Sequence, residues 1–183
     1  ATLALCLPEA DASWLSEFSQ TLLAQLQRHG VCLIGGDTTS GPLNLGLTLI
    51  GELPTGTALC RDRAQVGDLI AVTGTLGDAA LGLQVAIGAQ AIKEPTAREY
   101  LLRRLNRSEA RVQAGQLIRP HAHAAIDISD GLLQDLGHIL QRSSVGAVID
   151  IETLPLSTAM RHSVAHTQAL DYALYGGDDY ELL

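Results

Sequence analysis

The sequence has few aromatic residues, no basic run and only three cysteines, and each scarcity excludes something. Aromatic residues make up 3% of the 183 residues, so a core must be built mainly from aliphatic residues within the 46% hydrophobic fraction. The net charge is -8 at pH 7, and an acidic chain without basic runs argues against non-specific nucleic-acid binding. Nucleotide binding stays open, because Mg²⁺ can bridge carboxylates to phosphates.

Cysteine usage and hydropathy indicate a protein of a reducing compartment. Cys6, Cys32 and Cys60 are odd in number, lie in or beside apolar runs and include no Cys-x-x-Cys pair. We therefore expect buried free thiols in the cytoplasm rather than disulfides or a zinc site. No apolar run reaches the roughly 18 residues of a membrane span, and no signal peptide is recognisable.

Several catalytic signatures are missing as well. No Gly-x-Ser-x-Gly elbow occurs, and no nucleophile stands beside an evident base. The segment Gly74-Thr75-Leu76-Gly77-Asp78 resembles a phosphate cradle but lacks the Lys-Ser/Thr of a P-loop, so we interpret it as structural. The chain starts at Ala1 without Met and ends at Leu183, in both cases within an apolar run. Natural termini are usually polar, so we expect a piece of a longer protein.

Apolar periodicity predicts an α/β or α+β fold with a division near residue 67. Helices are predicted over residues 14–29, 79–87, 96–105, 110–118, 132–145 and 158–169, with Ser13 as the first N-cap and Arg104 on a solvated face. Strands are predicted over residues 2–7, 31–34, 43–50, 69–72, 124–128, 147–151 and 180–183. We assign residues 1–66 to an N-terminal domain and residues 67–183 to a second domain.

Residues 124–133 are the stretch around which the chain is organised, because they predict a buried strand, an acidic turn and a helix. Asp127, Ser129 and Asp130 stand at the strand-to-helix junction. Their oxygens suit hard metal ions, and free backbone N–H groups at such a junction suit phosphate. Gly131 permits the tight turn. The alternative is that Ser129 or Asp130 simply caps the helix.

Two other acidic segments also follow glycines. In Gly35-Gly36-Asp37-Thr38-Thr39 the glycines would let the backbone approach a phosphate, and Asp37 with the threonine hydroxyls offers Mg²⁺ ligands. Residues 176–181, Gly-Gly-Asp-Asp-Tyr-Glu, crowd like charges that are unfavourable unless they are solvated or offset by cations. The alternative for each segment is an ordinary solvated turn.

The single basic residues give weaker evidence for a binding site than the acidic segments do. Arg61 and Arg63 could neutralise a phosphate, although an arginine in a polar stretch usually lies on the surface. His121 and His123 are spaced like metal ligands on one strand, but no third histidine or cysteine is near, which favours a loop. Carboxylates, hydroxyls, glycines and an occasional arginine favour metal-assisted phosphoryl transfer over covalent catalysis.

Four segments, in this order and spacing, resemble the bacterial thiamine-monophosphate kinases. They are Gly35–Thr39, Val72–Asp78, Ala125–Leu132 and Gly176–Leu182. The similarity covers essentially the whole chain. It implies the two-domain architecture of the aminoimidazole ribonucleotide synthetase superfamily, in which mixed sheets pack with helices. The N-terminal α/β domain would form a homodimer through its sheet, and the C-terminal domain would be α+β.

The resemblance also implies an activity, the Mg²⁺-dependent transfer of the ATP γ-phosphate to thiamine phosphate, giving thiamine diphosphate. It assigns Mg²⁺ to Asp37, Asp127 and Asp130, ATP to Gly36, Asp37, Arg61 and Ser129, and the thiamine substrate to Asp178, where the family often has Glu.

The family has an N-terminal segment with further Mg²⁺-binding aspartates and a C-terminal part with a substrate-stacking aromatic, neither of which this chain contains. We therefore expect no turnover by this chain alone. Two alternative hypotheses for the function remain. The protein could be another ATP-dependent member of the superfamily, of the selenophosphate synthetase or hydrogenase-maturation dehydratase type, or a non-catalytic nucleotide-binding homologue.

Overall fold

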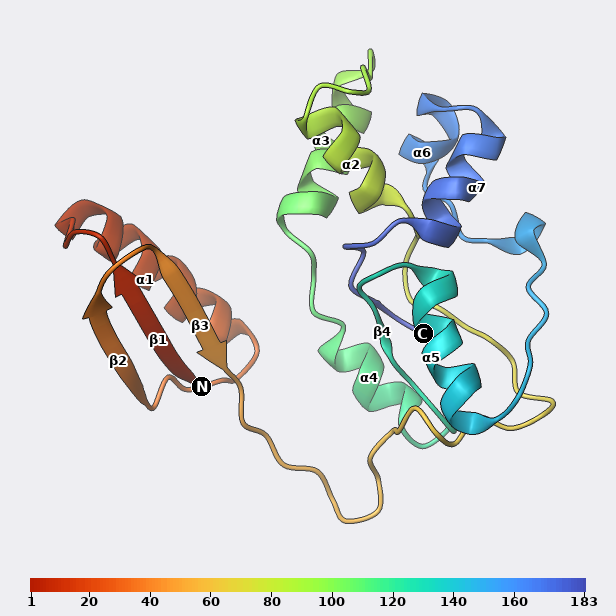
Figure 1. Ribbon diagram of the computed structural model, residues 1–183, viewed down its shortest axis with the longest axis horizontal. Coiled ribbons are helices and arrows are strands. Elements are labelled where there is room, and N and C mark those ends of the chain that lie inside the picture. The colour runs from red at the N-terminus through yellow and green to blue at the C-terminus, as the bar shows by residue number, and fades with distance from the viewer. The chain divides into compact units, whose positions relative to one another are not determined.

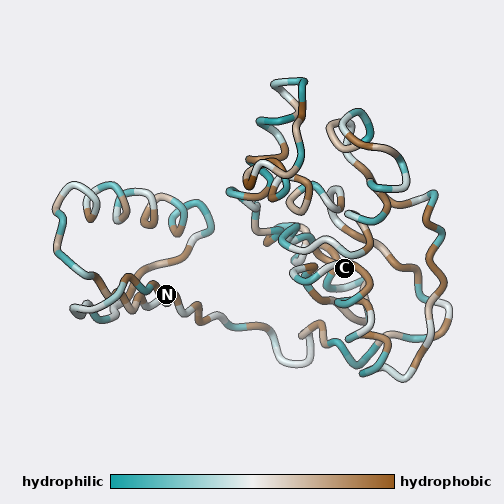
Figure 2. Tube along the Cα trace, turned by 45° about the horizontal axis from the view of Figure 1, so that its top comes forward, coloured by the Kyte–Doolittle hydropathy of each residue, from teal (hydrophilic) through white to brown (hydrophobic).

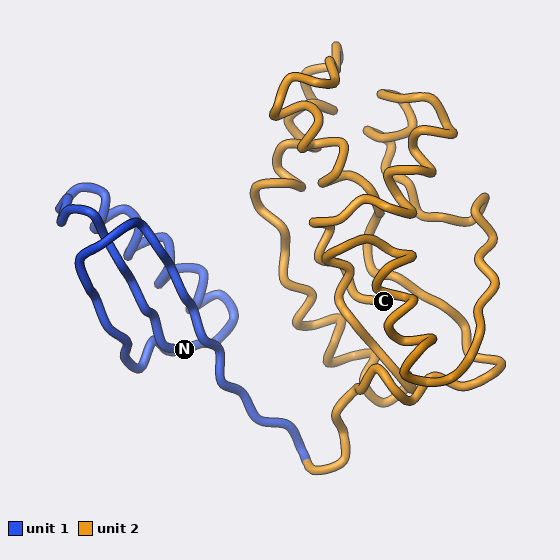
Figure 3. Tube along the Cα trace, in the orientation of Figure 1, with its two compact units in different colours: residues 1–54 blue, residues 55–183 orange.

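The structure, a computed structural model, describes residues 1–183 as two compact units. Unit 1 is Ala1–Pro54 and unit 2 is Thr55–Leu183, shown in different colours in Figure 3. The boundary expected near residue 67 lies inside unit 2, within residues 49–77, which contain neither helix nor strand. Both units combine helices with small sheets, and the predicted mixture of helices and strands is confirmed.

Unit 1 is a three-stranded mixed sheet with one helix on it (Figure 1). Its elements are β1 (Thr2–Leu7), α1 (Ala12–Arg28), β2 (Gly35–Ser40) and β3 (Asn44–Thr48). The central β1 pairs with β2 in parallel and with β3 antiparallel. The strand predicted over residues 31–34 is wrong, and the predicted glycine-rich turn is instead strand β2. The parallel pairing with β1 begins at Gly35, opposite Thr2, so residues 31–34 lie before the ladder and have no strand partner.

The sequence explains how α1 begins and which side it buries. The Asp11 carboxylate is the N-cap and accepts hydrogen bonds from the N–H groups of Ser13 (2.8 Å) and Trp14 (3.1 Å), so the expectation that Ser13 caps the helix is wrong. The hydrophobic residues of α1 lie on the side of the sheet (Figure 2), where Leu26 is buried, as are Leu5 and Leu7 of β1. This aliphatic core holds β1 against the helix.

Unit 2 surrounds a short antiparallel strand pair with helices (Figure 1). Its elements are α2 (Asp78–Ala86), α3 (Pro95–Asn106), α4 (Val112–Ile118), β4 (Asp127–Ile128), α5 (Leu132–Ser143), a 3₁₀ helix (Ile151–Thr153), α6 (Thr158–Ser163), α7 (His166–Tyr175) and β5 (Glu181–Leu182). The core is aliphatic, as the composition predicts, and includes Leu76, Leu81, Leu101, Ile128, Leu132, Leu154, Leu156, Met160 and Leu170.

The helix predictions for unit 2 are confirmed to within a few residues, with one correction. The helix predicted over residues 158–169 is two helices, because Val164 is extended (φ -138°, ψ 165°). The strands predicted over residues 69–72 and 147–151 are wrong. The Thr73 N–H donates to the Leu182 carbonyl (2.9 Å), but this pairing does not continue along residues 69–72, and an apolar run without a ladder partner is not a strand.

The three cysteines are free, which confirms the prediction of no disulfide. Cys32 is exposed and Cys6 and Cys60 are half-buried, so the prediction that all three thiols are buried is wrong. None of the helices has the length and apolar character needed to cross a lipid bilayer.

Candidate functional site

The strand pair of unit 2 brings two of the predicted acidic segments together. The aspartate turn (residues 127–131) begins in β4, and the C-terminal acidic segment (residues 176–181) leads into β5, which pairs with β4. Beyond the ladder, the Asp178 N–H donates to the Ser129 carbonyl (2.9 Å). Two segments that are far apart in the sequence therefore lie side by side at the end of one strand pair.

A buried carboxylate organises the backbone of the aspartate turn. The N–H groups of Ser129 and Asp130 both donate to Asp135 Oδ2, each at 3.0 Å, and Asp135 is 2% exposed in the first turn of α5. The N-cap of α5 is Gly131, and no side chain caps this helix. The alternative that Ser129 or Asp130 caps the helix is therefore wrong. The N–H groups of Ser129 and Asp130 are therefore not free for a phosphate.

The carboxylates of the aspartate turn face solvent. Asp127 and Asp130 are exposed, and neither pairs with a cationic side chain. Asp130 Oδ2 accepts only a 3.3 Å hydrogen bond from Gln134 Nε2. The charge of Asp178, then burial, the hydrogen bond to Asp178 and the charges of Asp127 and Asp130, raise the pKa of the Tyr180 phenol. Three unneutralised carboxylates thus make this region electronegative.

The C-terminal acidic segment buries alternate side chains. Asp178 is half-buried and Tyr180 is exposed, whereas Asp179 and Glu181 are 1% and 0% exposed. Burial of two carboxylates requires cations or strong hydrogen bonds. The interpretation of the whole segment as a solvated turn is therefore wrong.

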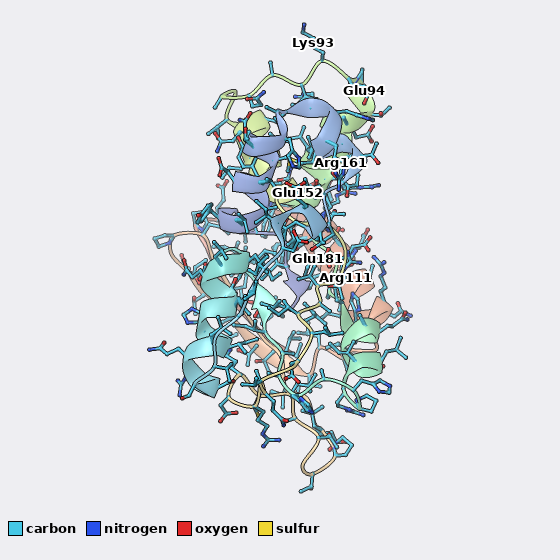
Figure 4. The ribbon with its side chains drawn as sticks, turned by 90° about the vertical axis from the view of Figure 1, so that its right-hand side faces the viewer. Lys93, Glu94, Arg111, Glu152, Arg161 and Glu181 are labelled. Atoms are coloured by element: carbon cyan, nitrogen blue, oxygen red, sulfur yellow. The ribbon has the colours of Figure 1, made fainter.

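Arg111 and Arg104 supply the cations. Arg111 forms a bidentate pair with Glu181, with two bonds of 2.6 Å (Figure 4), and Arg104 Nη2 lies 2.9 Å from Glu181 Oε1. The Thr73 hydroxyl also donates a hydrogen bond to Glu181 Oε2 (2.6 Å). Burial alone would raise the pKa of Glu181, but the hydrogen bonds with Arg111 and Thr73 and the charges of both arginines outweigh it and lower the pKa.

Asp179 joins the same segment to the start of α2. Its carboxylate accepts hydrogen bonds from the N–H groups of Gly77 (2.6 Å) and Ala79 (3.2 Å), and its nearest cation, Arg104, is 4.0 Å away. Burial raises the pKa of Asp179 to about 6 despite these partners. A carboxylate at a helix N-terminus satisfies donors that the helix leaves unpaired.

The glycine-rich segment Gly74–Asp78 belongs to this buried network. Asp78 is 0% exposed and accepts hydrogen bonds from the hydroxyls of Thr75 (2.5 Å), Ser157 (2.5 Å) and Tyr100 (3.1 Å). The N–H groups of Leu76 and Gly77, which could otherwise bind a phosphate, donate to the Pro155 carbonyl (3.0 Å) and to Asp179 Oδ2 (2.6 Å). The contacts support the structural interpretation of this segment.

The backbone beside the aspartate turn is strained. Asp178 (φ 67°) and Tyr180 (φ 51°) are both left-handed, and the Tyr180 N–H donates to the Ile128 carbonyl (2.8 Å). A Cβ on Gly177 would lie 2.5 Å from the Ser129 carbonyl oxygen, so only glycine fits. Non-glycine residues with positive φ persist where surrounding contacts impose them, often at functional sites.

The first acidic segment lies in unit 1. Asp37 is exposed on β2, and its Oδ1 accepts a hydrogen bond from the Thr38 N–H (2.8 Å). A Cβ on Gly36 would collide with the Leu3 carbonyl of β1, so strand packing already accounts for this glycine. Asp37 is therefore an exposed carboxylate of unit 1 without a cationic partner, whereas the aspartate turn belongs to unit 2.

The remaining candidates are less organised. Arg61 is exposed, and only its carbonyl is bonded, by the Ser143 hydroxyl (3.0 Å). His121 and His123 lie outside any strand, and His123 Nδ1 is 2.8 Å from Asp68 Oδ1. No three histidine, cysteine, aspartate or glutamate side chains in the chain are arranged to hold a metal ion by themselves.

Sequence reasoning missed three residues of this region, namely Arg104, Arg111 and Asp135. The expectation that Arg104 is solvated is wrong, because it is 9% exposed. The sequence spacing could have indicated this burial, because Arg104 follows the buried Leu101 by three residues and so lies on the same face of α3. Asp135 likewise stands on the apolar face of α5, next to buried Leu136.

Two family models match the chain in succession. The N-terminal domain of the AIR synthase related proteins matches residues 1–53, and their C-terminal domain matches residues 65–175, more than half of the chain. The chain belongs to the AIR synthase related protein family. The short stretch left between the matched domains includes the boundary between the two units.

This AIR synthase related protein resembles thiamine-monophosphate kinases in sequence and in structure. It is 50% identical over 181 residues to that of Salmonella typhimurium, which covers 99% of this chain and 56% of the relative. The crystal structure of the Stenotrophomonas maltophilia kinase superposes with a TM-score of 0.92 at 50% identity, covering 99% of this chain and 58% of that one. A structure described as AaThiL complexed with AMPPCP and TMP gives 0.81 at 30% identity, covering 99% and 59%.

The chain thus spans little more than half the length of the relatives it matches. The resemblance to thiamine-monophosphate kinases and the architecture expected from it are confirmed.

Proposed function

We propose that the full-length protein is a thiamine-phosphate kinase, which transfers the γ-phosphate of ATP to thiamine phosphate and releases ADP and thiamine diphosphate. The observation that carries this proposal is the 50% identity to a thiamine-monophosphate kinase across 99% of the chain. The pairing of two acidic segments at the end of β4 and β5 supports it, because this chemistry needs carboxylates near phosphates.

The aspartate turn fits the group that the reaction requires. Asp127 and Asp130 are exposed oxygen donors without cationic partners. Mg²⁺ is usually held by one or two protein carboxylates, while substrate phosphates and water complete its ligands, so the absence of a three-carboxylate cluster is compatible with it. Asp127 and Asp130 would hold Mg²⁺. By the resemblance, Asp37 of unit 1 would also bind Mg²⁺. When bound, Mg²⁺ offsets the phosphate charges.

The remaining roles follow the resemblance. Gly36, Asp37, Arg61 and Ser129 would contact ATP, and Asp178 would contact the thiamine phosphate. Ser129 and Asp178 are joined by a backbone hydrogen bond of 2.9 Å, which supports neighbouring positions for the two substrates. The AaThiL structure, with AMPPCP and TMP together, is a relative that binds both kinds of ligand.

The chain's residues would act by position and charge. The terminal β–γ bond of ATP breaks, and a bond forms to a phosphate oxygen of thiamine phosphate, so two anions must approach each other. The exposed Arg61 guanidinium, which has no side-chain partner, is available to a phosphate. The aspartate turn is clamped by Asp135 on one side and by Asp178 on the other, which fixes its carboxylates before substrates bind.

Asp130→Asn in the full-length protein tests the central role. We expect formation of thiamine diphosphate, followed by chromatography, to fall by roughly 100-fold or more, since a charged ligand of the Mg²⁺ that offsets the phosphate charges is lost. Asp171→Asn removes the same charge from an exposed site on α7 and should leave the rate unchanged. Full turnover by Asp130→Asn would remove that residue from the site, and absence of any product from the wild-type protein would overturn the proposed function.

We further propose a cytoplasmic homodimer. The three free cysteines support a reducing compartment. For the dimer, Leu43, Leu45 and Leu47 in and before β3 are 57%, 47% and 43% exposed, an unusual apolar edge for a monomer. Light scattering of the full-length protein tests this, and a monomeric mass at micromolar concentration would contradict it.

A further inference from the structure

We propose that Asp135 is a positioning residue that sets the geometry of the aspartate turn and thereby its affinity for the divalent cation. The proposal rests on the proposed function, in which Asp127 and Asp130 are the cation's ligands. Asp135 itself is not a ligand, because it is buried behind the turn and bonded to its backbone.

The contacts of Asp135 are directed at the turn. One carboxylate oxygen, Oδ2, accepts the N–H groups of two consecutive residues, Ser129 and Asp130, each at 3.0 Å. Neither N–H group donates to any other acceptor. The charge also lies in the first turn of α5, where the helix N-terminus favours an anion. A charge-assisted pair of bonds to one carboxylate oxygen fixes a backbone more strongly than neutral hydrogen bonds do.

The two N–H groups determine where the Asp130 side chain points. With both N–H groups directed inward at Asp135, the turn presents the Asp130 carboxylate to solvent. The opposite side of the turn is held independently, by the Asp178 N–H on the Ser129 carbonyl (2.9 Å). Without Asp135, the turn would be held only from the side of the C-terminal acidic segment, by the N–H groups of Asp178 and Tyr180, and the two exposed carboxylates would lose their fixed spacing.

A role in holding α5 together does not explain this geometry. Leu132, Leu136 and Ile139 already bury the apolar face of the helix, at 2%, 5% and 5% exposure. A residue needed only for packing would be apolar at this buried position. A carboxylate that accepts two N–H groups from the ligand-bearing turn is the arrangement by which protein groups behind a metal site orient its ligands.

The test measures Mn²⁺ binding to the full-length protein in the presence of AMPPCP, by electron paramagnetic resonance of the free ion. Asp135→Ala should weaken binding ~10- to 100-fold, the usual effect of losing a group that orients metal ligands. Asp135→Asn keeps an acceptor oxygen in the same place and should stay within about threefold of the wild type. Asp135→Glu keeps the charge but displaces the oxygen by one methylene, and should weaken binding about tenfold or more.

Leu136→Ala is the matched control, because it removes a neighbouring buried side chain of α5 that cannot hydrogen-bond to the turn. It should lower the melting temperature and leave Mn²⁺ affinity unchanged. If Asp135→Ala does not fold, Asp135→Glu carries the comparison. Wild-type affinity in Asp135→Ala or Asp135→Glu, or an equal loss in Leu136→Ala, would overturn the proposal.

The assay separates this proposal from the proposed function. Mn²⁺ binding does not depend on which molecule accepts the phosphate. A wild-type protein that binds Mn²⁺ but does not use thiamine phosphate would overturn the kinase assignment, while the ranking of the Asp135 variants would still decide the role of Asp135.

Discussion

Replacing Arg104 by leucine is the perturbation whose effect the structure defines best. Arg104 lies 2.9 Å from Glu181, 4.0 Å from Asp179 and 3.9 Å from Asp78, and all three carboxylates are at most 1% exposed. Breaking a buried ion pair by removing one partner costs about 3 to 5 kcal/mol, because a charge is left without compensation. Native proteins have only about 5 to 15 kcal/mol in total, so this variant should be severely destabilised.

The partners that remain place the effect near the lower end of that range. Glu181 keeps Arg111 and Thr73, and Asp78 keeps three hydroxyl donors. Asp179 loses its nearest cation and keeps only two backbone N–H groups. Arg104 Nε is buried without a hydrogen-bond partner, so its removal relieves one penalty. We therefore expect a loss of about 3 kcal/mol in the free energy of unfolding of unit 2.

Hydrogen exchange followed by mass spectrometry, on the full-length protein, measures this loss locally. Exchange in peptides from α2 and α3 should accelerate by roughly 100-fold, since about 1.4 kcal/mol corresponds to a factor of ten. Arg98→Leu is the control, because Arg98 is exposed on the same helix and surface changes usually stay within about 0.5 kcal/mol. If Arg104→Leu exchanged as slowly as Arg98→Leu, the buried charges would not depend on Arg104 and the reasoning would fail.

Three further predictions follow from single contacts. The pKa of Asp179 is about 6 in the folded protein and about 3.8 in the unfolded chain. Its contribution to stability, at most about 3 kcal/mol, is therefore lost as the pH rises from about 4 to 6. Urea unfolding at a series of pH values should show this loss in the wild type and not in Asp179→Asn. Gly177→Ala should reduce thiamine diphosphate formation up to about 100-fold, because its Cβ meets the Ser129 carbonyl, and unchanged kinetics would contradict this. Ser144 ends α5 with φ 55°, so Ser144→Gly should raise the stability of unit 2 by about 1 kcal/mol or less in denaturant melts, and a loss would contradict it.

The sequence predicted the helices more completely than the strands, and the difference is physical. The strands expected over residues 2–7 and 43–50 are present as β1 and β3, whereas β2 was expected as a turn. The 3.6-residue period of α1 and α3 is local information, so their bounds came out nearly right. A strand exists only where another strand supplies its hydrogen bonds. Residues 31–34 and 147–151 are apolar enough, yet they find no partner, while the polar Gly35–Ser40 pairs along its whole length with β1.

The candidate site divides in the same way. That the acidic segments sit at the ends of apolar runs was visible in the sequence, and the structure places two of them side by side. That Asp179 and Glu181 are buried was not visible, because the arginines that make burial possible lie about 70 residues earlier in the chain. Neighbouring carboxylates of one short segment thus have different environments. Asp178 is half-buried and Asp179 is fully buried, and this difference depends on tertiary contacts.

The most direct test of the account is ADP release by the full-length protein with ATP and Mg²⁺, with and without thiamine phosphate. We expect ADP release that requires thiamine phosphate and that produces an equal amount of thiamine diphosphate. No acceptor-dependent release, with ATP still bound, would contradict it and would direct the search to other ATP-dependent reactions of the AIR synthase related proteins.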